Sequence, residues 1–73
     1  MKVWIGDPPK KCDLCNEDLT DKFIDGKLVN GSWGILCPDC FDDAGVGLGL
    51  GNGQLYHKYI SGDGSTQWRK IAG

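Results

Sequence analysis

The sequence predicts a small α+β domain that is stabilised by a bound metal ion, and three observations support this fold class. The chain has 73 residues, which indicates one domain, and at this length an apolar core alone gives marginal stability. Hydrophobic residues make up 40% of the chain, and 12 glycines add conformational entropy that folding must overcome. Two closely spaced cysteine pairs supply metal ligands, and the segments around them carry strand, turn and helix signals.

The cysteine pairs both read C-x2-C: Cys12 and Cys15 come first, and Cys37 and Cys40 follow after 21 intervening residues. Two residues between cysteines let both thiolates reach one ion from a tight turn, and four soft thiolates suit tetrahedral Zn²⁺. We therefore predict one structural Zn²⁺ with these four ligands. An iron centre has the same ligand pattern and stays open as an alternative. Disulfides or a redox-active pair are less favoured, because nothing indicates an oxidising compartment or a βαβ pattern.

The segment between the two pairs predicts a β-hairpin or small meander. Asp25-Gly26 is a type I′ turn signal, and it lies between the β-leaning segments "TDKFI" and "KLV". Asn30-Gly31 is a second turn signal, followed by a strand, "SWGIL", that leads into the second cysteine pair.

The second pair is expected to begin a helix of about two turns. Pro38 suits the first turn, where a backbone N–H has no partner to lose, and the aspartates that follow favour the positive end of the helix dipole. Gly45 is a natural stop. The helix would thus carry Cys37 and Cys40 at its start.

The predicted arrangement resembles a treble-clef zinc finger. The first cysteine pair lies on a tight turn (a zinc knuckle), a β-hairpin follows, and the second cysteine pair lies at the start of a helix. This resemblance covers residues 12–44. A zinc ribbon, in which both pairs lie on hairpin knuckles, is the alternative. Residues 11–56 also resemble small zinc-finger proteins encoded by bacteriophages, through the first C-x-x-C, the "DG" pair, the Trp-led strand into "CPDC" and the segment "GVGLGLGNGQLY". That group has no settled activity. The resemblance implies a viral origin, a host-cytoplasm location and a zinc site, and it assigns no catalytic residue.

Residues 45–55 are expected to form a glycine-rich crossing, with glycine at every second position up to Gly53. The run lacks the Gly-Lys-Ser/Thr of a P-loop, and it follows a helix rather than opening one, so a phosphate site is not favoured. Its period of two predicts an ordered extended or looped segment. Val46, Leu48 and Leu50 would cover the core, and the bare glycine face would admit a backbone or an aromatic ring. A flexible linker is the alternative.

Residues 56–71 predict a second hairpin around the turn "SGDGS", and the N-terminal "KVWI" is a candidate edge strand. The hairpin concentrates aromatic and basic residues, namely Tyr56, His57, Lys58, Tyr59, Trp68, Arg69 and Lys70. Such residues suit a protein interface, and equally base stacking and phosphate contact. The plainer alternative is that Trp68 and one tyrosine belong to the core. His57 fits a strand residue better than a fifth metal ligand.

The charge distribution favours a protein partner over nucleic acid. Residues 1–43 hold five lysines against nine carboxylates, a net charge of −4, and residues 44–73 carry +2. Four thiolates on one Zn²⁺ would add −2 to the first part, and a polyanion binds mainly through cations. We expect a module that binds a host or viral protein, and a nucleic-acid-binding finger that uses the C-terminal hairpin is the alternative.

We do not expect an enzyme, because four cysteines fill the zinc shell and the chain offers no catalytic triad or carboxylate pair. No apolar run is long enough for a signal sequence or a membrane span, so a soluble cytoplasmic protein is expected.

Overall fold

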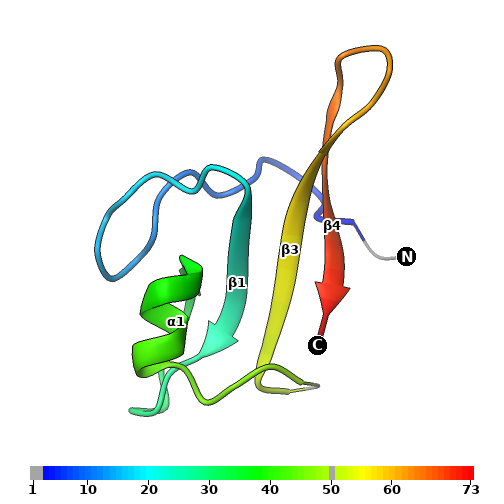
Figure 1. The fold of residues 1–73 in the computed structure, drawn as a ribbon. Coiled ribbons are helices and arrows are strands. Elements are labelled where there is room, and N and C mark those ends of the chain that lie inside the picture. The colour runs from blue at the N-terminus through cyan, green and yellow to red at the C-terminus, as the bar shows by residue number, and fades with distance from the viewer. Residues whose placement is uncertain (1–2, 50) are drawn as a thin grey trace.

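The computed structural model describes residues 3–49 and 51–73, which form one antiparallel sheet and one helix (Figure 1). The elements are β1 (Lys22–Lys27), β2 (Trp33–Leu36), α1 (Pro38–Ala44), β3 (Gly53–Ile60) and β4 (Thr66–Ala72), with the sheet order β2-β1-β3-β4. The predicted α+β class, the short helix and the C-terminal hairpin are confirmed. Within the described ranges, no helix has the length and hydrophobicity needed to cross a membrane.

The turn predicted at Asp25-Gly26 is wrong, because β1 runs straight through both residues and pairs with β2 on one side and β3 on the other. The chain reverses later, at the second turn signal. There the Ser32 N–H donates to the Asn30 side chain (2.9 Å), and Gly31 adopts a left-handed φ of +92° that favours glycine.

Packing against α1 explains why glycine occupies position 26 inside a strand. The ring of Phe41 lies over this part of the sheet, and a Cβ atom at Gly26 or at Gly45 would overlap it. A Cβ atom at Gly53 would lie 2.7 Å from Phe41 Cζ. The expectation that bare glycines admit an aromatic ring is therefore confirmed for the two ends of the glycine run, Gly45 and Gly53.

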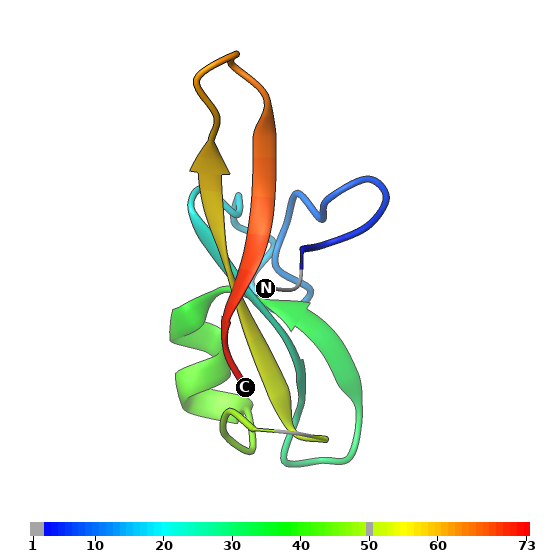
Figure 2. The ribbon, with the colours of Figure 1, turned by 90° about the vertical axis from the view of Figure 1, so that its right-hand side faces the viewer.

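The buried apolar residues lie on both faces of the sheet, with α1 over one face and the N-terminal segment over the other (Figure 2). We call the first the helix face; its cross-strand residues are Ile24, Leu36 and Leu55. We call the second the aromatic face; its rings are Trp4, Phe23, Tyr56 and Trp68. The Trp4 ring is edge-on to the rings of Phe23 and Tyr56, with centroids 5.3 and 5.5 Å away. Each face thus has only a thin covering layer.

The N-terminal segment runs along the outer edge of β4. Among the described residues it forms a single β-bridge there and not a strand. Val3 pairs with Arg69, and the Trp4 N–H donates to the Trp68 carbonyl (2.8 Å). Lys2 of the predicted edge strand lies outside the described residues. The bridge protects part of an exposed sheet edge and places Trp4 on the aromatic face.

The glycine run is a hydrogen-bonded loop and not an alternating strand. Gly47, Gly49 and Gly51 have φ values of +111°, +141° and +81°, so the regular exchange of faces is broken. As a result Val46 and Leu48 remain 41% and 45% exposed, and the prediction that they cover the core is wrong. Leu50, the third predicted apolar residue, lies outside the described residues.

Backbone hydrogen bonds tie this loop to the end of β1. The Val46 N–H donates to the Lys27 carbonyl (3.0 Å), and the Lys27 N–H donates to the Asn52 carbonyl (2.7 Å). These bonds favour the ordered loop over the flexible linker.

Candidate metal centre and neighbouring surface

The first cysteine pair lies on a tight turn before β1. The Asn16 N–H donates to the Cys12 carbonyl, and the Cys12 N–H donates to the Glu17 carbonyl, both at 3.0 Å. Asn16 closes the turn with a left-handed φ of +61°, which asparagine tolerates better than most residues. The turn brings the Cys12 and Cys15 thiols into the same small region.

Asp13, between these two cysteines, fastens the turn to the outer edge of β2. Its N–H donates to the Ile35 carbonyl, and its Oδ2 accepts the Ile35 N–H, both at 2.8 Å. Gly34 leaves room for this contact, because a Cβ atom there would lie 3.1 Å from Asp13 Oδ2. The strand that leads to Cys37 is thereby held against the first pair. Sequence analysis missed this role, for which the only signal is an aspartate between two candidate ligands.

The second cysteine pair begins α1. Cys37 is the N-cap residue, and its Sγ accepts the Cys40 N–H (3.4 Å). On the first turn, Cys12 Sγ likewise accepts the Leu14 N–H (3.4 Å). Hydrogen bonds from backbone N–H groups favour the thiolate form, which is the form that binds metal.

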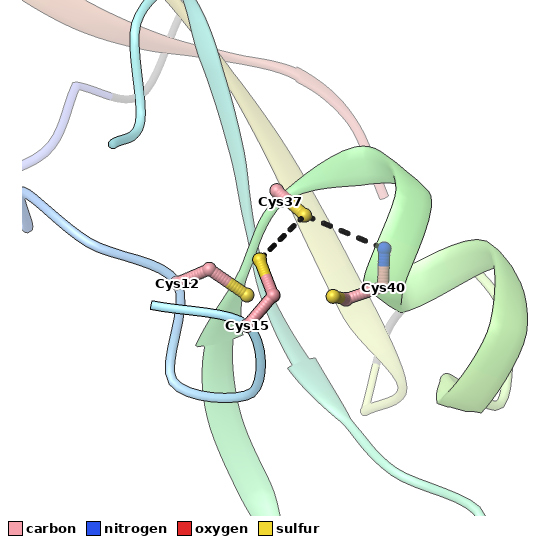
Figure 3. A group of neighbouring side chains, drawn as sticks. All are labelled: Cys12, Cys15, Cys37 and Cys40. Atoms are coloured by element: carbon pink, nitrogen blue, oxygen red, sulfur yellow. Dashed lines mark hydrogen bonds between the residues drawn. The ribbon is translucent and has the colours of Figure 1, made fainter. Parts of the chain in front are cut away.

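The four sulfur atoms of Cys12, Cys15, Cys37 and Cys40 all lie within 4.8 Å of one another and can hold one metal ion (Figure 3). All four thiols are free, and Cys15 Sγ is 3.8 Å from Cys37 Sγ. In a tetrahedral site, Zn–S bonds of about 2.3 Å separate the sulfur atoms by about 3.8 Å, so the cluster fits such an ion. His57 is not part of the cluster.

The electrostatics of the cluster differ from one thiol to the next. Burial opposes ionisation of Cys12, but N–H groups of Cys15, Cys37 and Leu14 outweigh it and lower the pKa of Cys12 to about 6. The pKa of Cys40 is instead raised, first by its interaction with the Cys37 thiol and then by burial. The protein therefore stabilises one thiolate, whereas further thiolates in the same space need a positive charge among them.

Two of the seven residues predicted for a binding surface are core residues. Tyr56 and Trp68 are only 6% and 7% exposed, so placing them on a contact surface was wrong. Both rings pack against Phe23, with centroids 5.1 Å away in each case. The alternative that Trp68 and one tyrosine belong to the core is confirmed.

The other five residues divide between the two faces, because neighbouring strand residues point to opposite sides. His57, Tyr59 and Arg69 lie on the helix face, and Lys58 and Lys70 lie on the aromatic face. On the helix face the Arg69 guanidinium lies over the Tyr59 ring, 4.6 Å from its centroid. The predicted concentration of basic groups is therefore split by the pleat of the sheet.

A groove of about 440 Å³ opens on the helix face, between α1, the sheet and the glycine loop. Its apolar lining comes from Ile24, Phe41, Val46, Leu48 and Leu55, and Lys22 and Asp42 stand among the lining residues. Sequence analysis did not single out Lys22 or Phe41, because their proximity depends on how α1 packs on the sheet.

Comparison with known protein families, with curated proteins and with solved structures finds no match for this chain.

Proposed function

We propose that the chain is a structural zinc-binding module in which Cys12, Cys15, Cys37 and Cys40 hold one Zn²⁺. The observation that carries this proposal is the approach of all four sulfur atoms to within 4.8 Å. One pair on a tight turn, the hairpin β1–β2, and the other pair at the start of α1 support a treble-clef arrangement over a zinc ribbon.

The proposed role of the ion is to hold the fold and not to perform chemistry. When bound, Zn²⁺ supplies the positive charge that lets the clustered thiols ionise together. Four protein ligands leave no coordination position for a substrate or a water, so we propose that the chain is not an enzyme. The residues around the cluster orient the ligands: Asp13 fixes the first turn to β2, and Leu14 and Cys40 donate N–H groups to sulfur.

We further propose that the stabilised fold serves to bind a protein partner. The helix face offers exposed apolar side chains beside a groove, which is typical of an interaction site. Nucleic-acid binding is the second candidate, favoured by the Arg69–Tyr59 stack. Lys58 and Lys70 lie on the opposite face from Arg69, so only part of the hairpin's positive charge can contact one phosphate backbone, which supports the protein partner.

The zinc proposal is tested by metal content and by folding together. Protein purified with zinc is expected to contain one equivalent, to lack the visible absorbance of a thiolate-bound iron, and to lose dispersed amide NMR signals when a chelator is added. Cys37→Ser is expected to reproduce the chelator result. Asp39→Ser is a suitable control, because it lies in the same helix but outside the sulfur cluster. A dispersed spectrum from reduced, metal-free protein would contradict the proposal.

A further inference from the structure

We infer that the groove and a row of basic residues next to it form one docking surface for an extended acidic peptide that carries an apolar anchor. This inference rests on the proposed partner-binding function and specifies its site and the chemistry of the partner. The surface lies on the helix face and joins α1, the glycine loop and the three strands β1, β3 and β4.

The groove provides the place for the anchor. Its side-chain lining is mainly apolar, and Val46 and Leu48 expose 41% and 45% of their surface beside it. Gly47 forms part of the wall, and a Cβ atom added there would meet nothing within 4 Å, so the wall is open on that side. A volume of about 440 Å³ lies near the lower end of ligand-pocket sizes, about 300–1,000 Å³, and suits one or two apolar side chains.

The basic row begins at the groove and crosses three strands. Lys22, which lines the groove, is opposite His57 in the β1–β3 register, and His57 is opposite Arg69 in the β3–β4 register. Residues directly opposite each other in neighbouring strands point to the same side of the sheet, so all three lie on the helix face. In the part of the chain that the structure describes, the only ion pair joins Lys11 and Asp18, so neither Lys22 nor Arg69 has a carboxylate partner.

The end of the row is held in position for an incoming anion. Arg69 Nε donates to Gln67 Oε1 (3.1 Å), and the guanidinium stacks on Tyr59. Its direction is thus set by neighbours that leave its charge uncompensated. Lys22 and Arg69 are separated by two strand spacings, about 9–10 Å, which two flexible glutamate side chains at alternate positions of an extended peptide, about 7 Å apart, can bridge.

The combination of groove and row favours a peptide over nucleic acid. A phosphate backbone carries charge along its whole length, whereas this surface is basic at one end and apolar at the other. Asp42, an exposed residue of α1, contributes to the groove lining and places a negative charge at the apolar end of the surface. A peptide segment with an apolar residue followed by two spaced carboxylates matches this surface, with the apolar residue in the groove and the carboxylates along the basic row.

The test is an amide NMR titration of the full chain with the blocked peptide Phe-Ser-Glu-Ser-Glu, whose phenylalanine and two glutamates share one face when it is extended. We expect the shifted signals to gather at the groove and at Lys22, His57 and Arg69. Peptides with lysine in place of both glutamates, or with serine in place of phenylalanine, are expected to bind at least about fivefold more weakly. Equal binding of all three peptides would overturn the inference.

Matched variants separate the surface from general charge effects. Lys22→Glu with Arg69→Glu is expected to weaken peptide binding about tenfold, because attraction at two sites becomes repulsion. Lys58→Glu with Lys70→Glu makes the same change in net charge on the aromatic face and is expected to alter binding less than about twofold. An equal effect of the two pairs would contradict a localised row.

A second pair of variants tests the groove. Leu48→Ser should weaken binding about threefold or more, because it removes exposed apolar lining without opening the core. Ile60→Ser removes an exposed apolar side chain on the other face and should leave binding unchanged. No loss from Leu48→Ser would remove the anchor site from the proposal.

Zinc content and spectral dispersion are measured on the same samples, so the two proposals can fail separately. If the chain folds without zinc, the titration is run on that form and still decides the docking site. If zinc loads and the fold is intact but the peptide does not shift the surface, the docking inference fails alone. If labelled oligothymidine shifts the same residues with a steep salt dependence and the peptide does not, nucleic acid replaces the peptide as the ligand.

Discussion

The cysteine-rich half of the chain and the C-terminal hairpin are stabilised by different means. From Cys12 to α1, ordered structure depends on a tight turn, a four-residue strand and a seven-residue helix, each too short to be stable alone. From β3 to β4, longer strands pair along most of their length, with one register shift at Leu55/Tyr56, and project beyond the rest of the sheet (Figures 1 and 2). The first region brings four candidate metal ligands to one point, whereas the second region packs its aromatic rings together.

The strand β1 connects the two regions. It contributes to the apolar core on both faces of the sheet, with Phe23 among the aromatic rings and Ile24 opposite Leu36. Both side chains are almost fully buried. Damage on either side of the sheet should therefore reach the other side through β1.

Removal of the metal should have the largest effect. Structural Zn²⁺ typically contributes about 10–16 kcal/mol of apparent binding free energy, more than the whole stability expected of a domain of this size. We expect the hairpin to be lost with the cysteine-rich half, because a two-stranded hairpin alone is marginal in water. Amide NMR before and after chelation measures this. Persistence of the β3–β4 signals in the metal-free chain would show that the two regions fold independently.

Trp68→Ala should be the most damaging change on the hairpin side. It removes a buried ring that packs on Phe23 and should lower the free energy of unfolding by about 3–5 kcal/mol. Denaturant unfolding of the zinc-loaded chain measures the change. Trp33→Ala is the matched control, because Trp33 is 51% exposed and should contribute much less. Similar losses for the two variants would argue against the aromatic cluster as the main support of the hairpin.

Gly26→Ala should destabilise the helix face by about 1–3 kcal/mol, because the added methyl group overlaps the Phe41 ring. Gly62→Ala is the control in the hairpin turn, where a Cβ atom meets nothing within 4 Å and φ is not left-handed. Thermal unfolding of both variants compares them. A neutral Gly26→Ala would mean that α1 can move away from the sheet without loss.

Features that depend on local sequence could be predicted, whereas features that depend on packing between distant residues could not. Ligands of one ion need a fixed spacing whatever surrounds them, so the cluster from Cys12 to Cys40 could be predicted from local pattern. The strand character of Asp25-Gly26 could not, because a ring 15 residues further along the chain determines it. The alternation in 56–60 and 66–71 was visible, but it does not reveal which face is covered. Tyr56 and Trp68 were therefore misplaced.

Asp13→Ala should have a moderate effect, confined to the cysteine-rich half. It removes the acceptor for the Ile35 N–H and should lower stability by about 1 kcal/mol and weaken zinc binding. Asp13→Asn keeps an acceptor oxygen and should restore most of both. Competition with a chromogenic chelator measures zinc affinity. If Asn does not rescue, the carboxylate acts through its charge and not through the hydrogen bond.

Arg69→Gln should have the smallest effect on folding, because the guanidinium stacks on a partly exposed ring and such contacts contribute about 0.5–1 kcal/mol. Its backbone pairing with His57 and Val3 would be unchanged. Loss of the charge should nevertheless weaken binding of the acidic peptide about threefold, because Arg69 and Lys22 are the two permanently charged residues of the row. Arg69→Lys keeps the charge but not the planar stack, and it should recover much of the binding. Stability and peptide affinity, measured on the same preparations, would then change independently on this face of the hairpin. A parallel loss of both would mean that Arg69 supports the fold of β3–β4, and that the row does not extend beyond Lys22 and His57.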